Sequence, residues 1–270
     1  MKLIPIILLI LAAAAGAEYY PARFEEGHTF SAKETFLYTA PGDTSAVITL
    51  IPPGEFLEIT EFAEETFTAD SCQWGWYGVE YRQNNTVYTG FVQDRDLAFT
   101  HTLLGADTLF VFRLSGFNTA DNAYEGEISV IAEGEVIYSR DHRPQWTPWG
   151  RMFDYDVESR TASPAGFTGV KNLIFLYFGL EGSGLECRED LIVWTEDHQL
   201  VPGPAIMIMD DSDVIRYWTE VILPTTPGGH DEEVTHHFLG EEYTDQWESV
   251  EDRTTVFHWT GHGFEEEQAE

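Results

Sequence analysis

The sequence predicts an all-β protein, because short apolar runs, frequent turn residues and a scarcity of helical patterns occur together along the chain. From Thr35 onward, runs rich in Val, Ile, Phe, Tyr, Trp and Thr are separated by Gly, Pro, Asn and Asp, which is the pattern of strands joined by turns. Hydrophobic residues make up 43% of the 270 residues and aromatic residues 14%, enough to build a folded core.

Several of these runs alternate cleanly between apolar and polar residues. In 56–61, Leu57 and Ile59 share one face and Glu58 and Thr60 the other, as in a half-buried strand. One segment, 241–251, is expected to be helical, and the Pro-rich segments 144–148 and 202–204 are expected to be loops. The expected strands are 35–38, 46–50, 56–61, 76–81, 87–92, 108–114, 127–131, 135–138, 173–178, 191–194, 205–209, 214–223 and 254–259.

Residues 33–98 carry a recognisable order of strands and turns. A strand is followed by the turn Ala-Pro-Gly-Asp at 40–43, and a second strand by the turn Pro-Pro-Gly-Glu at 52–55. Further on come Trp-Tyr-Gly-Val-Glu-Tyr at 76–81 and Thr-Gly-Phe-Val at 89–92, with a Leu at position 97. This order resembles the bacterial SH3 domain. Phe91 stands where that family usually has Trp, and Tyr38 where its first strand often carries Arg.

The resemblance implies a small SH3-like barrel at 28–100 that binds a peptide or cell-wall peptidoglycan stems. The remainder, 101–264, is expected to form a larger β-sandwich or sheet-rich domain, followed by an acidic tail at 265–270. A small barrel has little core volume, so some aromatic side chains should face outward and line a groove. Alternation along 76–81 places Tyr77, Val79 and Tyr81 in the core. The expected ligand-binding residues are Tyr38, Trp74 and Trp76.

The first seventeen residues have the pattern of a secretory signal peptide. A charge at Lys2 precedes an apolar run, and the run ends in Ala-Gly-Ala at 15–17, so cleavage is expected after Ala17. The apolar run is too short to span a bilayer, and no later stretch is long and apolar enough. The mature protein is therefore expected in the periplasm or outside the cell. In such a compartment Cys72 and Cys187 can pair, but the sequence leaves open whether they do.

Known catalytic and metal-binding patterns do not match this chain. Cys187 lies among acidic residues, which raise the pKa of a thiol, and 230–237 is rich in His and Glu but lacks His-Glu-x-x-His. The segment Asp-Asp-Ser-Asp at 210–213 offers oxygen ligands of the kind that Ca²⁺ prefers, for a weak Ca²⁺ or Mg²⁺ site, but it lacks the glycine and distal Glu of an EF-hand loop. The sequence thus predicts a secreted, non-enzymatic binding protein without a cofactor. Two alternatives stay open: an exported hydrolase with an unrecognised site in 101–270, and a structural protein that docks a partner such as another envelope protein.

The charge balance also bears on partners and on stability. The chain has 47 Asp and Glu against 14 Lys and Arg, a formal charge of -33, which would repel a nucleic-acid backbone. Such acidity resembles that of proteins adapted to high salt, although it also serves solubility.

Thermal stability should rise from dilute buffer to molar NaCl, because the salt shortens the Debye length from about 10 Å to about 3 Å and so screens the repulsion between carboxylates. A melting temperature that stays flat or falls with NaCl would contradict this prediction.

Overall fold

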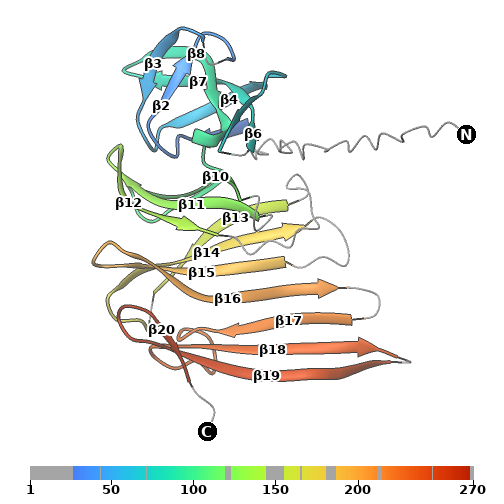
Figure 1. The fold of residues 1–270 in the computed structure, drawn as a ribbon. Coiled ribbons are helices and arrows are strands. Elements are labelled where there is room, and N and C mark those ends of the chain that lie inside the picture. Colours follow the sequence, from blue (N-terminus) through green and yellow to red (C-terminus); the bar gives the residue numbers. More distant parts are fainter. Residues whose placement is uncertain are drawn as a thin grey trace, which may run out of the picture.

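The expected all-β class is confirmed. The structure is a computed structural model that describes residues 27–42, 44–70, 72–118, 123–143, 155–164, 166–180, 187–211, 215–244 and 246–267. In these parts the chain is antiparallel β-sheet, with one 3-10 turn at Asp94–Asp96 (Figure 1). The sheets succeed one another along the chain, and none of them closes into a barrel. The closed barrel expected at 28–100 is therefore wrong, and this region is an open sheet.

The first module is an open six-stranded sheet. Its core contains Tyr77, Val79 and Tyr81, as expected from the alternation along that strand. The long acidic loop after the fourth strand forms a separate hairpin, β5 (Phe67–Ala69) and β6 (Cys72–Trp74). In spatial order the sheet is β1 (His28–Phe30), β4 (Phe56–Phe62), β7 (Trp76–Gln83), β8 (Thr86–Gln93), β2 (Thr35–Tyr38) and β3 (Val47–Ile51).

Two larger sheets follow the first module. The four-stranded sheet has the order β12 (Glu135–His142), β11 (Ala123–Ala132), β10 (Thr108–Asn118) and β9 (Thr100–Leu103). The eight-stranded sheet is a continuous succession of hairpins, β13 (Tyr155–Ala162), β14 (Val170–Leu180), β15 (Cys187–Thr195), β16 (Leu200–Asp211), β17 (Ile215–Ile222), β18 (Glu233–Tyr243), β19 (Trp247–Trp259) and β20 (Phe264–Glu266).

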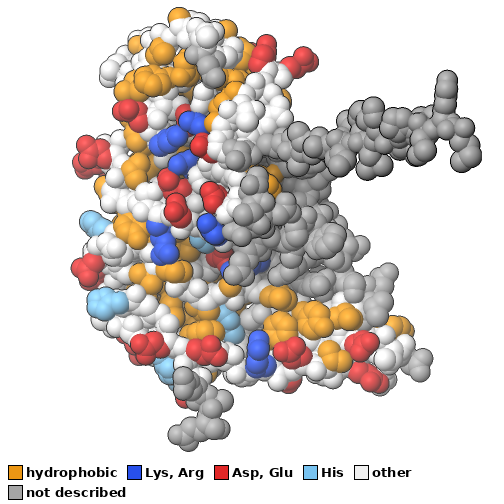
Figure 2. Space-filling model, in the orientation of Figure 1, with side chains coloured by type: hydrophobic (Ala, Val, Ile, Leu, Met, Phe, Trp, Pro, Cys, Tyr) orange, Lys and Arg blue, Asp and Glu red, His pale blue; other side chains and the backbone are white. Residues whose placement is uncertain are grey.

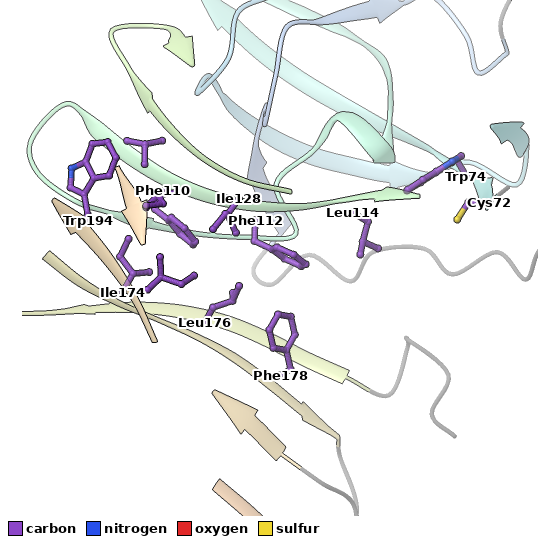
Figure 3. Close-up of a cluster of buried hydrophobic side chains, with 13 residues drawn as sticks. Cys72, Trp74, Phe110, Phe112, Leu114, Ile128, Ile174, Leu176, Phe178 and Trp194 are labelled. Atoms are coloured by element: carbon purple, nitrogen blue, oxygen red, sulfur yellow. The ribbon is translucent and has the colours of Figure 1, made fainter. Parts of the chain in front are cut away.

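Strand β10 is buried on both faces. On one face, Phe110 and Phe112 pack against side chains of β14 and β15, among them Phe178 and Trp194 (Figure 3). On the other face, Val111 packs with Ala32, Ala98 and Ile131 against the first module. Such burial explains the continuous apolar run Leu-Phe-Val-Phe at 109–112, since a strand covered on both sides does not alternate. The four-stranded sheet is therefore the layer between the first module and the eight-stranded sheet.

The eight-stranded sheet divides into two halves. Strands β16 and β17 pair only at Asp210 with Tyr217 and at Asp211 with Arg216, whereas other neighbouring strands pair along most of their length. Away from this hairpin the halves diverge, and an apolar cluster fills the space between them. It comprises Phe167, Val170, Leu173, Phe175, Leu191, Val193, Ile206, Val234 and Trp259.

Three expectations from the sequence are corrected here. The segment 202–204, expected to be a loop, lies within β16, where Pro202 stands opposite Ile192 of β15. The other Pro-rich segment, 144–148, lies outside the described residues. The helix expected at 241–251 is wrong, because this segment is the end of β18 and the start of β19, which pair along the hairpin. Within the acidic tail, Glu265 and Glu266 belong to β20 and pair with β19. The segment 241–251 and the tail both carry many Glu residues. Their backbones nevertheless pair within the eight-stranded sheet, because charged side chains are tolerated at exposed positions of a strand.

The central position of Phe112 gives a stability prediction. Its ring is fully buried among Phe99, Phe178 and His142, and it also covers Gly126, where a Cβ would lie 2.4 Å from Phe112 Cε2. Phe112→Ala should lower the free energy of unfolding by about 3 to 5 kcal/mol, because it leaves a cavity between two sheets.

Urea denaturation measures this loss. The matched control is Val136→Ala on β12, where the side chain is 40% exposed, and its effect should stay within about 0.5 kcal/mol. Equal losses for the two variants would contradict the assignment of β10 to the core.

Candidate functional site

The two tryptophans expected in a binding groove are buried. Trp76 has no exposed surface and Trp74 retains 4%, so the expected exposure of these two residues is wrong. The reason is the hairpin formed by β5 and β6, which the strand pattern did not reveal. Its Phe67 lies 5.4 Å from Trp76 between ring centroids, and Trp74 packs into the cluster beneath β10. As placed, neither indole offers a surface to a ligand.

Tyr38, the third expected residue, is half-buried at the margin of an apolar surface. Its ring meets Trp76 edge-on at 5.3 Å and lies 6.2 Å from Phe36. Phe36 is 45% exposed and stands directly opposite Leu50, which is 39% exposed. Tyr38 is thus the one expected residue that lies beside exposed apolar side chains.

Strand β3 and its neighbour β2 form this surface, here called the apolar edge and defined by Phe36, Val47, Ile48 and Leu50. All four side chains are more than a third exposed. Figure 2 shows hydrophobic side chains gathered over this end of the first module, where Figure 1 has β2, β3 and β8. Exposed apolar side chains grouped on one element indicate an interaction site, whereas isolated ones do not.

The apolar edge rests on a close approach between β2 and β8. A Cβ at Gly90 would lie 2.4 Å from the carbonyl oxygen of Tyr38 and 2.9 Å from Leu37 Cγ, so only glycine fits. Leu37 is fully buried, and Ile51 at the end of β3 is buried beside it. The inner side chains therefore hold β2 and β3 against the module, while the outer edge of β3 pairs with no described strand.

The other sheet edges in the described part of the chain are charged, short or covered. Strands β12 and β13 carry several charged residues each, and β1, β5, β6 and β20 have only three residues each. Strand β9 is uncharged, but it lies against β13, where Thr100 Oγ1 is 3.1 Å from Ser159 Oγ. Strand β3, with the sequence Val-Ile-Thr-Leu-Ile, has no charge and no proline. Natural proteins usually block such edges, so β3 is the candidate functional site.

A buried polar cluster lies between the two larger sheets, and no pattern in the sequence predicted it. Asp190 on β15 is bonded to His142 Nε2 at 3.0 Å and accepts a hydrogen bond from Arg188 Nε at 2.6 Å. Burial raises the pKa of Asp190, but the hydrogen bond from His142 and the charge of Arg188 outweigh burial, and the pKa falls below its ordinary value. The carboxylate thus stabilises the contact between β12 and β15 when it is ionised.

A second buried carboxylate lies on the opposite face of β15. Glu189 accepts hydrogen bonds from Arg160 Nε at 3.1 Å and Nη2 at 2.9 Å, and the guanidinium lies 4.0 Å from the centroid of the Phe175 ring. Burial raises the pKa of Glu189 although Arg160 opposes the shift. Because the arginine satisfies both carboxylate oxygens, this pair holds β13 against β15.

The cysteines and histidines show no reactive pair or metal cluster among the described residues. Cys72 and Cys187 form no disulfide in the described part of the chain, and burial together with nearby carboxylates raises the pKa of Cys72 to about 12. No group of three or more His, Cys, Asp or Glu side chains in the described ranges is placed to hold a metal ion. The expected weak Ca²⁺ site at 210–213 lies outside the described side chains.

Comparison with protein-family models, with curated proteins and with solved structures finds no match to this chain. In the part of the chain that the structure describes, no helix has the length and apolar character needed to cross a membrane. Any functional argument therefore depends on the geometry of the sites themselves.

His236 gives a prediction about pH. Its side chain is buried against Phe257 at 5.0 Å between ring centroids, Nε2 has no hydrogen-bond partner among the described residues, and burial lowers its pKa to about 4. The unfolded chain binds a proton near pH 6.5 while the folded chain does not. The free energy of unfolding is therefore highest above pH 6.5 and falls by about 3 kcal/mol as the pH is lowered toward 4.

His236→Leu removes this titration. Urea unfolding between pH 7 and pH 4 should show a smaller loss of stability for the variant than for the natural chain. If the two proteins lose the same free energy over that range, His236 is not a buried neutral histidine.

Proposed function

We propose that this chain is an exported, non-enzymatic binding protein whose SH3-like first module takes up an extended peptide segment along β3. The observation that carries the proposal is the outer edge of β3, which is uncharged, unpaired and flanked by exposed apolar side chains. The export part depends on the signal-peptide pattern at 1–17, which lies outside the described residues.

Strand addition is the mode of binding that this geometry favours. An edge strand presents free backbone N–H and C=O groups, and an extended peptide can pair with them as an additional strand. Phe36 and Leu50, side by side across β2 and β3, would contact alternate side chains of that peptide. Backbone pairing would supply affinity, and these contacts would supply the preference for apolar residues.

The charge of the chain narrows the class of peptide. With a formal charge of -33, the protein attracts segments that carry Lys or Arg and repels acidic ones. We therefore expect the preferred peptide to alternate apolar residues with basic or neutral polar ones.

The assignment of the first module as SH3-like is supported by its turns. Gly54 has a φ of 79°, as the Gly-ended turn before the third SH3 strand implies. Asn84 and Asn85, with φ of 49° and 62°, join β7 and β8 in a two-residue turn between Gln83 and Thr86. Two consecutive residues with positive φ are typical of tight hairpins, which favour Asn at these positions.

A peptide selection tests the proposed function. Random peptides displayed on phage are selected on the full mature chain, and enriched peptides are then titrated against Leu50→Lys and Val136→Lys. The two replaced residues are 39% and 40% exposed, and both variants add one positive charge, but only Leu50 belongs to the apolar edge. Leu50→Lys should weaken binding by about tenfold or more, and Val136→Lys should not.

Two results would contradict the proposal. One is that no peptide is enriched over a selection on an unrelated acidic protein. The other is that enriched peptides bind the two lysine variants equally well.

A further inference from the structure

A second concave site lies far from β3, where three distant segments of the chain meet. Strand β12, the turn between β15 and β16, and the turn between β19 and β20 enclose a pocket of ≈ 360 Å³. This volume falls within the range of small-molecule sites. The pocket requires the packing of the four-stranded sheet on the eight-stranded sheet, so no single segment of the sequence could reveal it.

Two side chains in the wall of the pocket, those of Tyr138 and Arg140, make contacts with the surrounding protein. Arg140 Nη1 donates to the carbonyl oxygen of Leu200 at 3.1 Å and thereby joins the two sheets. The Tyr138 ring packs edge-on against Trp194 at 6.3 Å, and Trp194 is stacked on its other side by His198 at 5.5 Å. The Tyr138 and Arg140 side chains are therefore held in place before any ligand arrives, which lowers the entropy cost of binding.

The polar groups around the pocket are of mixed kinds. The Arg140 guanidinium can only donate hydrogen bonds, the Asp197 carboxylate can only accept them when ionised, and the Tyr138 hydroxyl and the His262 ring can do both. Within the described residues, the Asp197 carboxylate, the Tyr138 hydroxyl and the His262 ring have no protein partner. The floor is apolar, formed by Leu200 to Pro202.

This combination selects a class of ligand. An anion such as phosphate would meet Asp197 and a strongly negative protein, and a cation would meet Arg140. A purely apolar molecule would leave the polar groups desolvated and unpaired. A neutral ring with several hydroxyl groups avoids all three conflicts. It carries no charge, each hydroxyl can both donate and accept a hydrogen bond, and the C–H face of the ring can pack on Tyr138 and Pro202. We infer that this pocket is a binding site for a neutral carbohydrate.

Titration followed by NMR tests the inference with defined probes. Glucose, galactose, mannose and N-acetylglucosamine are added to the ¹⁵N-labelled full mature chain, with glucuronate and glucosamine as charged comparisons. At least one neutral sugar should give saturable shifts confined to 195–202 and 260–263 and to β12. It should bind more tightly than both charged sugars.

Two neighbouring substitutions separate recognition from surface charge. Asp197→Asn and Glu196→Gln each remove one negative charge from the same turn, but only Asp197 lines the pocket. Asp197→Asn should weaken the sugar by about fivefold or more, since it loses a charge-assisted acceptor, while Glu196→Gln binds as the natural chain does.

Four results would overturn the inference: no saturable shift with any neutral sugar, shifts confined to other residues, equal effects of the two substitutions, or tighter binding of glucuronate than of glucose. The last result would identify a carboxylate site at Arg140 instead. Because the pocket shares no residue with the apolar edge, these outcomes do not depend on peptide binding at β3.

Discussion

The burial of β10 on both faces is the constraint on which the arrangement of the whole chain depends. Its Phe110 and Phe112 form a common core with the eight-stranded sheet, and its Val111 contacts the first module beside two small residues, Ala32 and Ala98. Small residues let the backbones of the module and the sheet approach closely. The first module is therefore fixed against the following sheets, and the orientation of the apolar edge follows from that contact.

The distribution of charge distinguishes the edge strand β3 from the other edge strands of the sheets. A chain with 47 acidic residues keeps its surfaces apart by repulsion, and its long edge strands β12 and β13 carry charges that also discourage pairing. Strand β3 differs from the other described edge strands. It is longer than three residues, carries no charge, and is not covered by another strand. An open edge of this kind carries a tendency to aggregate, and the proposed binding of a peptide would cover it.

The sequence predicted those features that depend on local alternation. The strand at 35–38 and the core positions Tyr77, Val79 and Tyr81 follow from a period of two, and the structure places them as expected. Strand β13 escaped notice because its sequence, Tyr-Asp-Val-Glu-Ser-Arg-Thr-Ala, is mostly polar and lies at the edge of a sheet. The burial of Trp76 could not be foreseen, because a hairpin within an acidic loop covers it. The pocket proposed to bind carbohydrate depends on residues up to 124 positions apart, from Tyr138 to His262, which only the packed sheets bring together.

Amide hydrogen exchange of β3 tests the proposed binding edge most directly. In the free protein, the β3 amides that point away from β2 should exchange rapidly, because they have no backbone partner. With a selected peptide bound, the same amides should become protected, while exchange along the charged edge strand β12 stays unchanged. Protection that appears elsewhere in the chain, with β3 unaffected, would contradict strand addition as the function of this module.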